Sequence, residues 1–414
     1  MPWRETDVMT ERLQFVAACQ RGLFSMTDLC EQFGIARKTG YKLLRRYAAL
    51  GPVGLCERSR RPWSSPTATR REVVQWVLAC RARHPHWGPK KLLQYLVRRD
   101  AHLPAPARTT DWPGVSTVAR LLARAGVTAA RGGGRARHAG PPAVPVQSTE
   151  PNDLWTADYK GPFRTGDGGW CYPLTVMDHC SRYLLRCEGL RGPTDAATRR
   201  GFEQLFLATG LPRRIRTDNG TPFAGPGVGG LSPLSAWWIR LGITPERIDR
   251  GHPEQHPQHE RLHRTLKAET ARPPAPTLRA QQGRFDRFQA EYNDERPHEA
   301  LGFDVPATRY QASPRVLPRR VPPVEYPAHF DTRRVYDHGD ITWQGRRLFV
   351  SEALAGEYLG LDEVDDGLWD LWFSTIRLAR LDQRYWSLHP VGPQPSSAQQ
   401  CVTNVVRTTC YRCP

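Results

Sequence analysis

The sequence predicts a multidomain protein with an all-α N-terminal region, a central α/β domain and a small C-terminal β domain. Apolar residues recur at helical spacing through residue 125, and from Leu154 the apolar period changes to two. Beyond Pro306 short alternating strands are separated by Gly and Asp turns. A chain of 414 residues suits two to four such units, at roughly 150 residues per domain.

The sequence pattern of residues 1–56 predicts a helix-turn-helix. Apolar residues at helical spacing predict a helix over 11–20, and Ser25 offers a cap for a second helix that runs through Phe33. A third helix is expected over 36–47. A short helix, a Gly turn and a basic second helix are together typical of a DNA-reading unit, although a solvated helical hairpin would show the same pattern.

The third helix is expected to place Tyr41, Leu44 and Tyr47 inward. Its basic side chains then face outward, where they can contact the bases and phosphates of double-stranded DNA. These candidate DNA-binding residues are Arg37, Lys38, Lys42, Arg45 and Arg46.

A second three-helix block is predicted over 71–130, with Ser116 as the cap of its last helix, and it is interpreted as a second DNA-binding unit. Residues 57–70 indicate a basic, Pro-containing linker. Residues 131–149 combine Gly, Pro and Arg and indicate a second basic linker.

Charge is concentrated at the front of the chain. Residues 1–150 contain 25 basic and 10 acidic side chains, against 34 and 31 in residues 151–414. The front third is therefore expected to bind a polyanion. No apolar stretch approaches the ~20 residues of a membrane span, and the first residues lack the apolar segment of a signal peptide, so we expect no membrane partner and a cytoplasmic location.

Residues 150–312 predict the α/β domain, with three strands, a helix over 194–209, a short strand over 213–217 and further helices. Asp158 lies on the first strand, Asp218 follows the fourth, and Glu260 lies on a helix that starts near Pro257. Ends of adjacent strands lie side by side, and a helix packed across that edge can bring the third acid close. Three carboxylates suit two Mg²⁺ ions, which prefer oxygen ligands and support phosphoryl transfer.

A competing motif overlaps the third acid. His259, Glu260 and His263 satisfy the H-E-x-x-H pattern of zinc metalloproteases. The helix of such a site is largely buried, yet basic residues surround this one. Glu260, Arg264 and Lys267 fall on one helix face, where they would pair a metal-binding acid with phosphate contacts.

The C-terminal part divides into two segments. Residues 313–390 are expected to form a small β-barrel-like domain. Residues 391–414 show no periodicity and are expected to be a disordered tail.

Four segments in order carry a family resemblance: WTADYKGPF (155–163), RTDNGTPF (216–223), GHPEQHPQHERLHRTLKAE (251–269) and YNDERPHEALGFDVPATRY (292–310). Together they resemble the integrase-like core of DDE transposases from bacterial insertion sequences. The resemblance covers residues 150–312, and the domain layout extends it over nearly the whole chain.

The resemblance implies an RNase H-like core in which Asp158, Asp218 and Glu260 are the catalytic, metal-binding acids. It implies two Mg²⁺ ions, with Mn²⁺ as a substitute, that serve the hydrolysis of a transposon end whose 3′-hydroxyl then attacks target DNA. The partners implied are terminal inverted repeats, target DNA and further copies of the chain assembled on DNA at the bacterial nucleoid.

Two departures from the family pattern stand out. The spacing of 41 residues between Asp218 and Glu260 exceeds the common one, and the Gly/Pro-rich stretch 224–233 is the expected site of the surplus. His256-Pro257 replaces the usual polar residue and Gly before the catalytic helix. A regulator derived from such a transposase, without activity, therefore stays an alternative. The RPH segment, with Arg296 and His298, suits packing and DNA contact equally.

Overall fold

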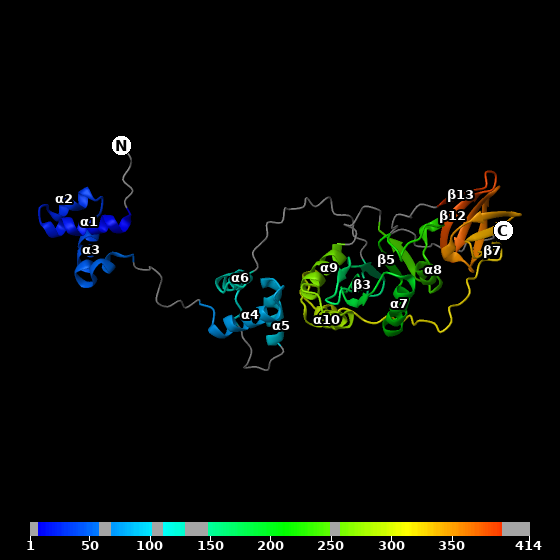
Figure 1. Ribbon diagram of the computed structural model, residues 1–414, viewed down its shortest axis with the longest axis horizontal. Helices are drawn as coiled ribbons and strands as arrows, with labels where there is room; N and C mark the ends of the chain where they lie inside the picture. Colours follow the sequence, from blue (N-terminus) through cyan, green and yellow to red (C-terminus); the bar gives the residue numbers. More distant parts are fainter. Residues whose placement is uncertain (1–6, 58–67, 102–110, 129–147, 249–256, 391–414) are drawn as a thin grey trace, which may run out of the picture. The chain divides into compact units, whose positions relative to one another are not determined.

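A computed structural model describes residues 7–57, 68–101, 111–128, 148–248 and 257–390. It divides into two compact units, Met1–Thr69 and Arg70–Pro414. Figure 1 shows helices at the N-terminal end of the chain and strands concentrated in its second half. The tail at 391–414 and most of both linkers lie outside the described residues. No helix in the described part is long and apolar enough to cross a membrane.

The first unit is the predicted helix-turn-helix arrangement. It consists of α1 (Val8–Arg21), α2 (Met26–Gln32), α3 (Arg37–Leu50) and a 3₁₀ turn, η1 (Gly51–Leu55). Ser25 caps α2 as predicted, and Asp28 returns the bond in a capping box. Its buried core consists of Phe15, Val16, Leu29, Cys30, Leu43 and Leu55.

The predicted rotation of α3 was wrong for Tyr41. This side chain is 55% exposed, whereas Gly40 and Leu43 are buried. Gly40 packs so closely that a Cβ there would lie 2.8 Å from the Cys30 Sγ. The close approach of α3 to the other helices therefore decides which face is inward, and Tyr41 joins the basic outer face.

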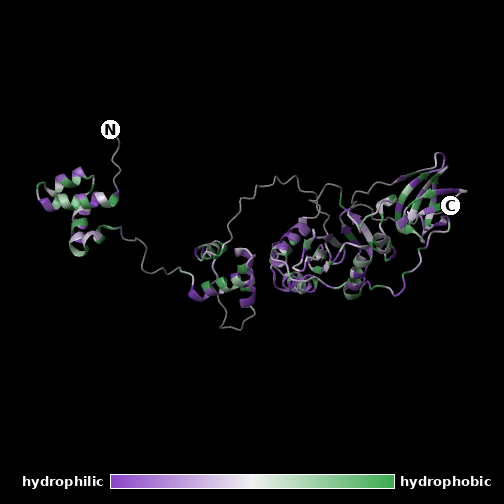
Figure 2. Cartoon of the chain, in the orientation of Figure 1, coloured by the Kyte–Doolittle hydropathy of each residue, from purple (hydrophilic) through white to green (hydrophobic). Residues whose placement is uncertain are grey.

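The second unit begins with three helices, α4 (Arg71–Arg83), α5 (Pro89–Ala101) and α6 (Val115–Arg124). Gly114, and not Ser116, is the N-cap residue of α6. Figure 2 shows hydrophilic and hydrophobic residues on each of these helices, as expected for amphipathic helices around a small core. The buried core side chains are Val77, Cys80, Trp87, Leu92, Leu93, Val118 and Leu122.

A mixed sheet forms the centre of the second unit (Figure 1). β3 pairs antiparallel with both β1 and β4, while β5 runs parallel to β1, and β6 parallel to β5. A short strand, β2, pairs with the start of β3. The strands are β1 (Leu154–Tyr159), β2 (Phe163–Arg164), β3 (Trp170–Asp178), β4 (Leu184–Leu190), β5 (Arg214–Thr217) and β6 (Thr244–Arg247).

Helices cover both faces of this sheet. Alternate residues of β1, Trp155 and Ala157, pack with α7 (Asp195–Thr209) and α8 (Pro233–Arg240). The opposite face packs against α9 (Pro257–Thr270) and α10 (Leu278–Ala290) through side chains such as Met177, Leu262 and Phe285. α9 begins at Pro257, where the sequence predicts the start of the helix that carries Glu260.

The C-terminal part is a five-stranded sheet in the order β13-β12-β11-β10-β7 beside a separate β8-β9 hairpin. The described strands do not close into the expected barrel, because β13 and β7 end the order without pairing to each other. Alternation along a strand is the same in an open sheet and in a barrel, so the sequence did not separate them. The strands are β7 (Asp331–Arg334), β8 (Asp340–Trp343), β9 (Arg346–Phe349), β10 (Tyr358–Asp365), β11 (Leu368–Phe373), β12 (Ile376–Asp382) and β13 (Ser387–Pro390).

Helix α8 belongs to two cores. Its Leu234, Trp237 and Trp238 pack under the central sheet, while Ala236 and Ile239 pack with the C-terminal strands. The stretch 224–233 takes part in the same seam: its 3₁₀ turn η2 (Val228–Gly230) starts with the Val228 N–H donating to the Val350 carbonyl at 2.9 Å. The stretch 224–233, where the extra residues between Asp218 and Glu260 were expected, therefore attaches the C-terminal sheet to the core.

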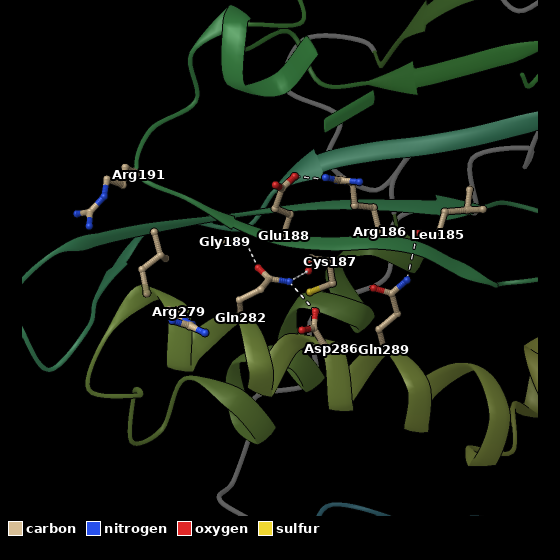
Figure 3. Close-up of a pocket in the computed structure, with 11 residues that line it drawn as sticks. Leu185, Arg186, Cys187, Glu188, Gly189, Arg191, Arg279, Gln282, Asp286 and Gln289 are labelled. Atoms are coloured by element: carbon tan, nitrogen blue, oxygen red, sulfur yellow. Dashed lines mark hydrogen bonds and ion pairs between the residues drawn. The ribbon is translucent and has the colours of Figure 1, made fainter. Parts of the chain in front are cut away.

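The free edge of β4 is covered by side-chain amides from α10 and its extension. Gln282 accepts from the Gly189 N–H at 2.8 Å and donates to the Cys187 carbonyl at 3.0 Å, as a neighbouring strand would (Figure 3). Gln289 donates to the Leu184 and Leu185 carbonyls. These bonds occupy main-chain groups that an open edge would offer to another chain.

The segment after α10 is a π-helical turn, η4 (Glu291–Glu295), which continues this pattern. Asn293 accepts from the Leu184 N–H and donates to the Leu184 carbonyl. Arg296 is 6% exposed and pairs with Glu269 of α9 at 3.0 Å. Of the two roles left open for Arg296, the geometry favours packing.

Replacing Gln282 by Leu is expected to loosen the β4 edge. The Gly189 N–H and Cys187 carbonyl lose their partners, and a buried unsatisfied group costs about 1–3 kcal/mol. Hydrogen exchange of residues 184–190, measured by mass spectrometry, should accelerate about tenfold or more. The exposed Gln311→Leu is the control, and unchanged exchange in Gln282→Leu would contradict the role of the amide.

Candidate metal centre

The parallel register of β1 and β5 sets the first two acids beside each other. Leu154 pairs with Arg214 and Thr156 with Arg216, a constant offset that places Asp218 level with Asp158. Since Trp155 and Ala157 face α7 and α8, alternation turns Asp158 to the opposite face of the sheet, the one that α9 covers.

The charge of one carboxylate acts on the other. The pKa of Asp158 is raised to about 7, first by burial and then by the negative charge of Asp218. Asp218 itself lies in a turn, where the Gly220 N–H donates to its Oδ1 at 3.1 Å. The neighbouring Asn219 ties the turn to the end of β6 by donating to the Ile248 carbonyl at 2.7 Å.

The third acid comes from α9. Glu260 lies exposed in the first turn of the helix, while Leu262 and Leu266 are each 1% exposed and pack into the core. One turn beyond Glu260, His263 brings its Nδ1 to 3.6 Å from the Asp158 Oδ2. The helix that carries Glu260 is therefore in contact with the first acid.

Within the described ranges, no three His, Cys, Asp or Glu side chains are grouped closely enough to hold a metal ion. The structure thus brings Asp158 and Asp218 together and places the helix of Glu260 against Asp158. The groove of about 660 Å³ in Figure 3 is lined by β4 and α10 and includes none of the three acids.

Both ring nitrogens of the second H-E-x-x-H histidine, His263, already face other side chains. The rings of His259 and His263 stand edge to face with centroids 5.4 Å apart, and His259 is 1% exposed. The Nε2 of His263 lies 2.8 Å from the Thr175 Oγ1, and its Nδ1 faces Asp158. A shared zinc ion would require one nitrogen from each ring directed to the same point.

Basic side chains flank the acids. Arg264 and Lys267 are exposed on α9. Lys160, which the sequence reasoning did not single out, has its pKa lowered first by burial and then by the charge of Lys267. Its position just beyond the end of β1, two residues after Asp158, was the available signal, because residues two apart in an extended chain share a face.

On the helix-turn-helix, four of the five candidate DNA-binding residues form one exposed surface of α3. Arg46 is different: it is partly buried and its guanidinium donates to the Cys56 carbonyl, which holds η1 against α3. The exposed set consists of Arg37, Lys38, Lys42 and Arg45, with Tyr41 among them.

Comparison with protein families assigns most segments of the chain. Two integrase core domain models match the central region, and two models, for a helix-turn-helix domain and a homeodomain-like domain, match the N-terminal region. The C-terminal domain of the IS481 transposase family matches the last sheet. The matched residues are 11–62 and 39–122 for the helical models, 148–253 and 241–306 for the integrase core, and 330–387 for the C-terminal domain.

Insertion elements encode similar proteins. An uncharacterized 31.7 kDa protein of element IS407 from Burkholderia multivorans is 24% identical over 38% of this chain and 54% of its own length. An uncharacterized 39.2 kDa protein of IS476 from Xanthomonas euvesicatoria is 25% identical over 46% of this chain and 48% of its own. The chain thus spans about half the length of these relatives.

Among solved structures, the HTLV-2 integrase catalytic core domain in complex with magnesium is 15% identical. It covers 39% of this chain and 99% of its own, with a TM-score of 0.31. A chain from the structure of the simian T-cell lymphotropic virus intasome in complex with PP2A regulatory subunit B56 gamma is 14% identical over 69% of this chain and 97% of its own, with a TM-score of 0.36.

The domain matches follow one another along the chain in a definite order. Helix-turn-helix domains come first, an integrase core domain follows, and a transposase C-terminal domain ends the described chain. The chain therefore carries N-terminal helix-turn-helix domains, an integrase core domain and a transposase C-terminal domain, and it is similar to proteins encoded by insertion elements.

Proposed function

We propose that the protein is an insertion-sequence transposase that binds the ends of its element and catalyses Mg²⁺-dependent DNA cleavage and strand transfer. The observation that carries the proposal is the pair of partly buried acids at the ends of the adjacent parallel strands β1 and β5, where Asp218 helps to raise the pKa of Asp158 to about 7. Perturbed acids of this kind are typical of catalytic sites.

The residues present fit magnesium. The site offers carboxylate oxygens, the ligands that Mg²⁺ prefers, and a divalent cation would relieve the repulsion between Asp158 and Asp218. Asp158, Asp218 and Glu260 would hold two Mg²⁺ ions, with Mn²⁺ as a substitute. Bound there, the ions supply charge stabilisation to the attacking and leaving oxygens of phosphoryl transfer.

The chain's other residues position the DNA in this proposal. Lys160, Arg264 and Lys267 bind phosphates next to the acids, since exposed Arg and Lys neutralise backbone charge. The α3 surface reads base edges of the terminal inverted repeats, and residues 71–130 form a second DNA-binding unit. Residues 131–149 link these units to the catalytic core at 150–312.

Two ends of the element must be joined, so copies of the chain assemble on the bound DNA. Because its DNA partners lie in the bacterial nucleoid, the protein acts in the cytoplasm at the nucleoid. The alternative, a regulator without activity, shares the DNA-binding residues. It differs in predicting that no acid substitution matters, because the wild type cuts nothing.

Asp158→Asn, Asp218→Asn and Glu260→Gln are each expected to lower Mg²⁺-dependent cleavage of labelled end DNA by more than about 100-fold. Each removes a metal-binding charge and keeps the shape, so DNA binding should persist. The measurement is a gel assay beside Asp195→Asn, which changes an exposed acid at the start of α7. Full cleavage by Asp158→Asn would refute the mechanism, and an inactive wild type would favour the regulator.

Asp158→Asn is also expected to raise the thermal midpoint of the metal-free protein, more at pH 8 than at pH 5. The folded-state pKa of about 7 lies above the ordinary 3.8, so folded-state stability falls as the pH rises from about 4 to about 7. The shift corresponds to at most about 4 kcal/mol. Scanning fluorimetry in EDTA measures it, with Asp195→Asn as the control. A pH-independent difference would contradict the carboxylate pair.

Lys38→Gln and Lys42→Gln are expected to weaken binding to end DNA and to lower the salt slope of log K by about 1 each, because each phosphate contact releases counterions. Fluorescence anisotropy at several salt concentrations measures the slope. Arg21→Gln, at the exposed end of α1, is the control. An equal loss for Arg21→Gln would show that overall charge, and not the α3 surface, determines binding.

A further inference from the structure

His263 occupies a junction of three elements around the first acid. It lies on α9, three residues after Glu260, and its side chain is 11% exposed. Three residues at 3.6 per turn leave His263 and Glu260 about 60° apart around the helix axis. Any constraint on the His263 side chain therefore constrains the position of Glu260.

Thr175 completes the junction. It is the cross-strand partner of Asp158 in the β1–β3 register and is fully buried. Its hydroxyl donates to the Asp158 carbonyl at 3.1 Å and lies 2.8 Å from the His263 Nε2. Because the hydroxyl has a single proton and donates it to that carbonyl, it accepts from the Nε2–H of His263.

The other nitrogen of His263 faces the acid itself. Its Nδ1 lies 3.6 Å from the Asp158 Oδ2. Apolar packing by Leu262 and Leu266 buries this side of α9, but such packing is non-directional. The hydrogen bond between His263 and Thr175 is directional, and it holds His263 beside Asp158, the residue whose carboxylate has to be oriented.

We propose that His263 and Thr175 are positioning residues, which orient the Asp158 carboxylate and hold α9 so that Glu260 reaches the same Mg²⁺ site. The inference rests on the proposed function, because the role in Mg²⁺ binding comes from that function, whereas the contacts of His263 are contacts within the protein itself. Outer partners that orient metal ligands typically change metal affinity by about 10–100-fold when they are removed.

Three variants separate the parts of this junction. His263→Leu keeps much of the volume and removes both polar contacts. His263→Gln keeps a donor near Thr175, and Thr175→Val removes the acceptor at nearly constant shape. The control is Thr265→Val on the same helix, because its hydroxyl bonds only to the Arg261 carbonyl of its own helix in the described contacts.

The first readout is Mg²⁺ binding by the full chain without DNA, as the Mg²⁺ concentration that gives half of the rise in thermal midpoint. His263→Leu and Thr175→Val should raise that concentration about 10–100-fold, and His263→Gln should raise it less. The double variant should be no worse than the worse single one, because the two side chains act through one contact. DNA affinity should not change.

The second readout is hydrogen exchange of residues 258–264 in the metal-free protein, which should accelerate in His263→Leu and Thr175→Val but not in Thr265→Val. If the wild type is active and His263→Leu and Thr175→Val bind Mg²⁺ and exchange as it does, the positioning role is overturned and the proposed function stands. A wild type that neither binds Mg²⁺ nor cuts DNA would overturn the proposed function and the metal role of His263 together, even if exchange accelerates.

Discussion

The structure of the candidate centre depends on main-chain pairing that holds two like charges side by side. Hydrogen bonds between β1 and β5 fix the register, and the register aligns Asp158 with Asp218. Their repulsion, added to burial, raises the pKa of Asp158 to about 7. Holding the two carboxylates together lowers the free energy of unfolding, and the surrounding core has to outweigh that loss. The aromatic cluster of α7 and α8 under the same strands does so by burying apolar surface.

Local pattern was sufficient for most elements. Ser25, Thr194 and Pro257 mark the starts of helices as their residue types predict, and period-two alternation located β1, β3 and β4. The alignment of Asp158 with Asp218 also followed from the sequence, because acids at the ends of neighbouring strands meet at one edge of a sheet.

The remaining features depend on contacts between segments far apart in the chain. Tyr41 was assigned to the wrong face because the close approach of Gly40 to Cys30 determines the rotation of α3. In the sequence Arg46 resembles the other basic residues of α3, and only the structure shows its hydrogen bond to the Cys56 carbonyl. His263 suggested zinc in the sequence, and only the neighbouring strands show its contacts with Thr175 and Asp158.

The helix α8 has a consequence for how the chain is divided. One face of α8 packs with the central sheet and the other with the C-terminal strands. The helix lies inside the match to the integrase core domain, yet it is shared with the region that matches the C-terminal domain. Removing the C-terminal sheet would leave Ala236 and Ile239 facing water and the Arg240–Glu357 ion pair broken. The smallest fragment that keeps α8 covered on both sides therefore extends through β13, so recombination between related chains has to exchange these two regions as one piece.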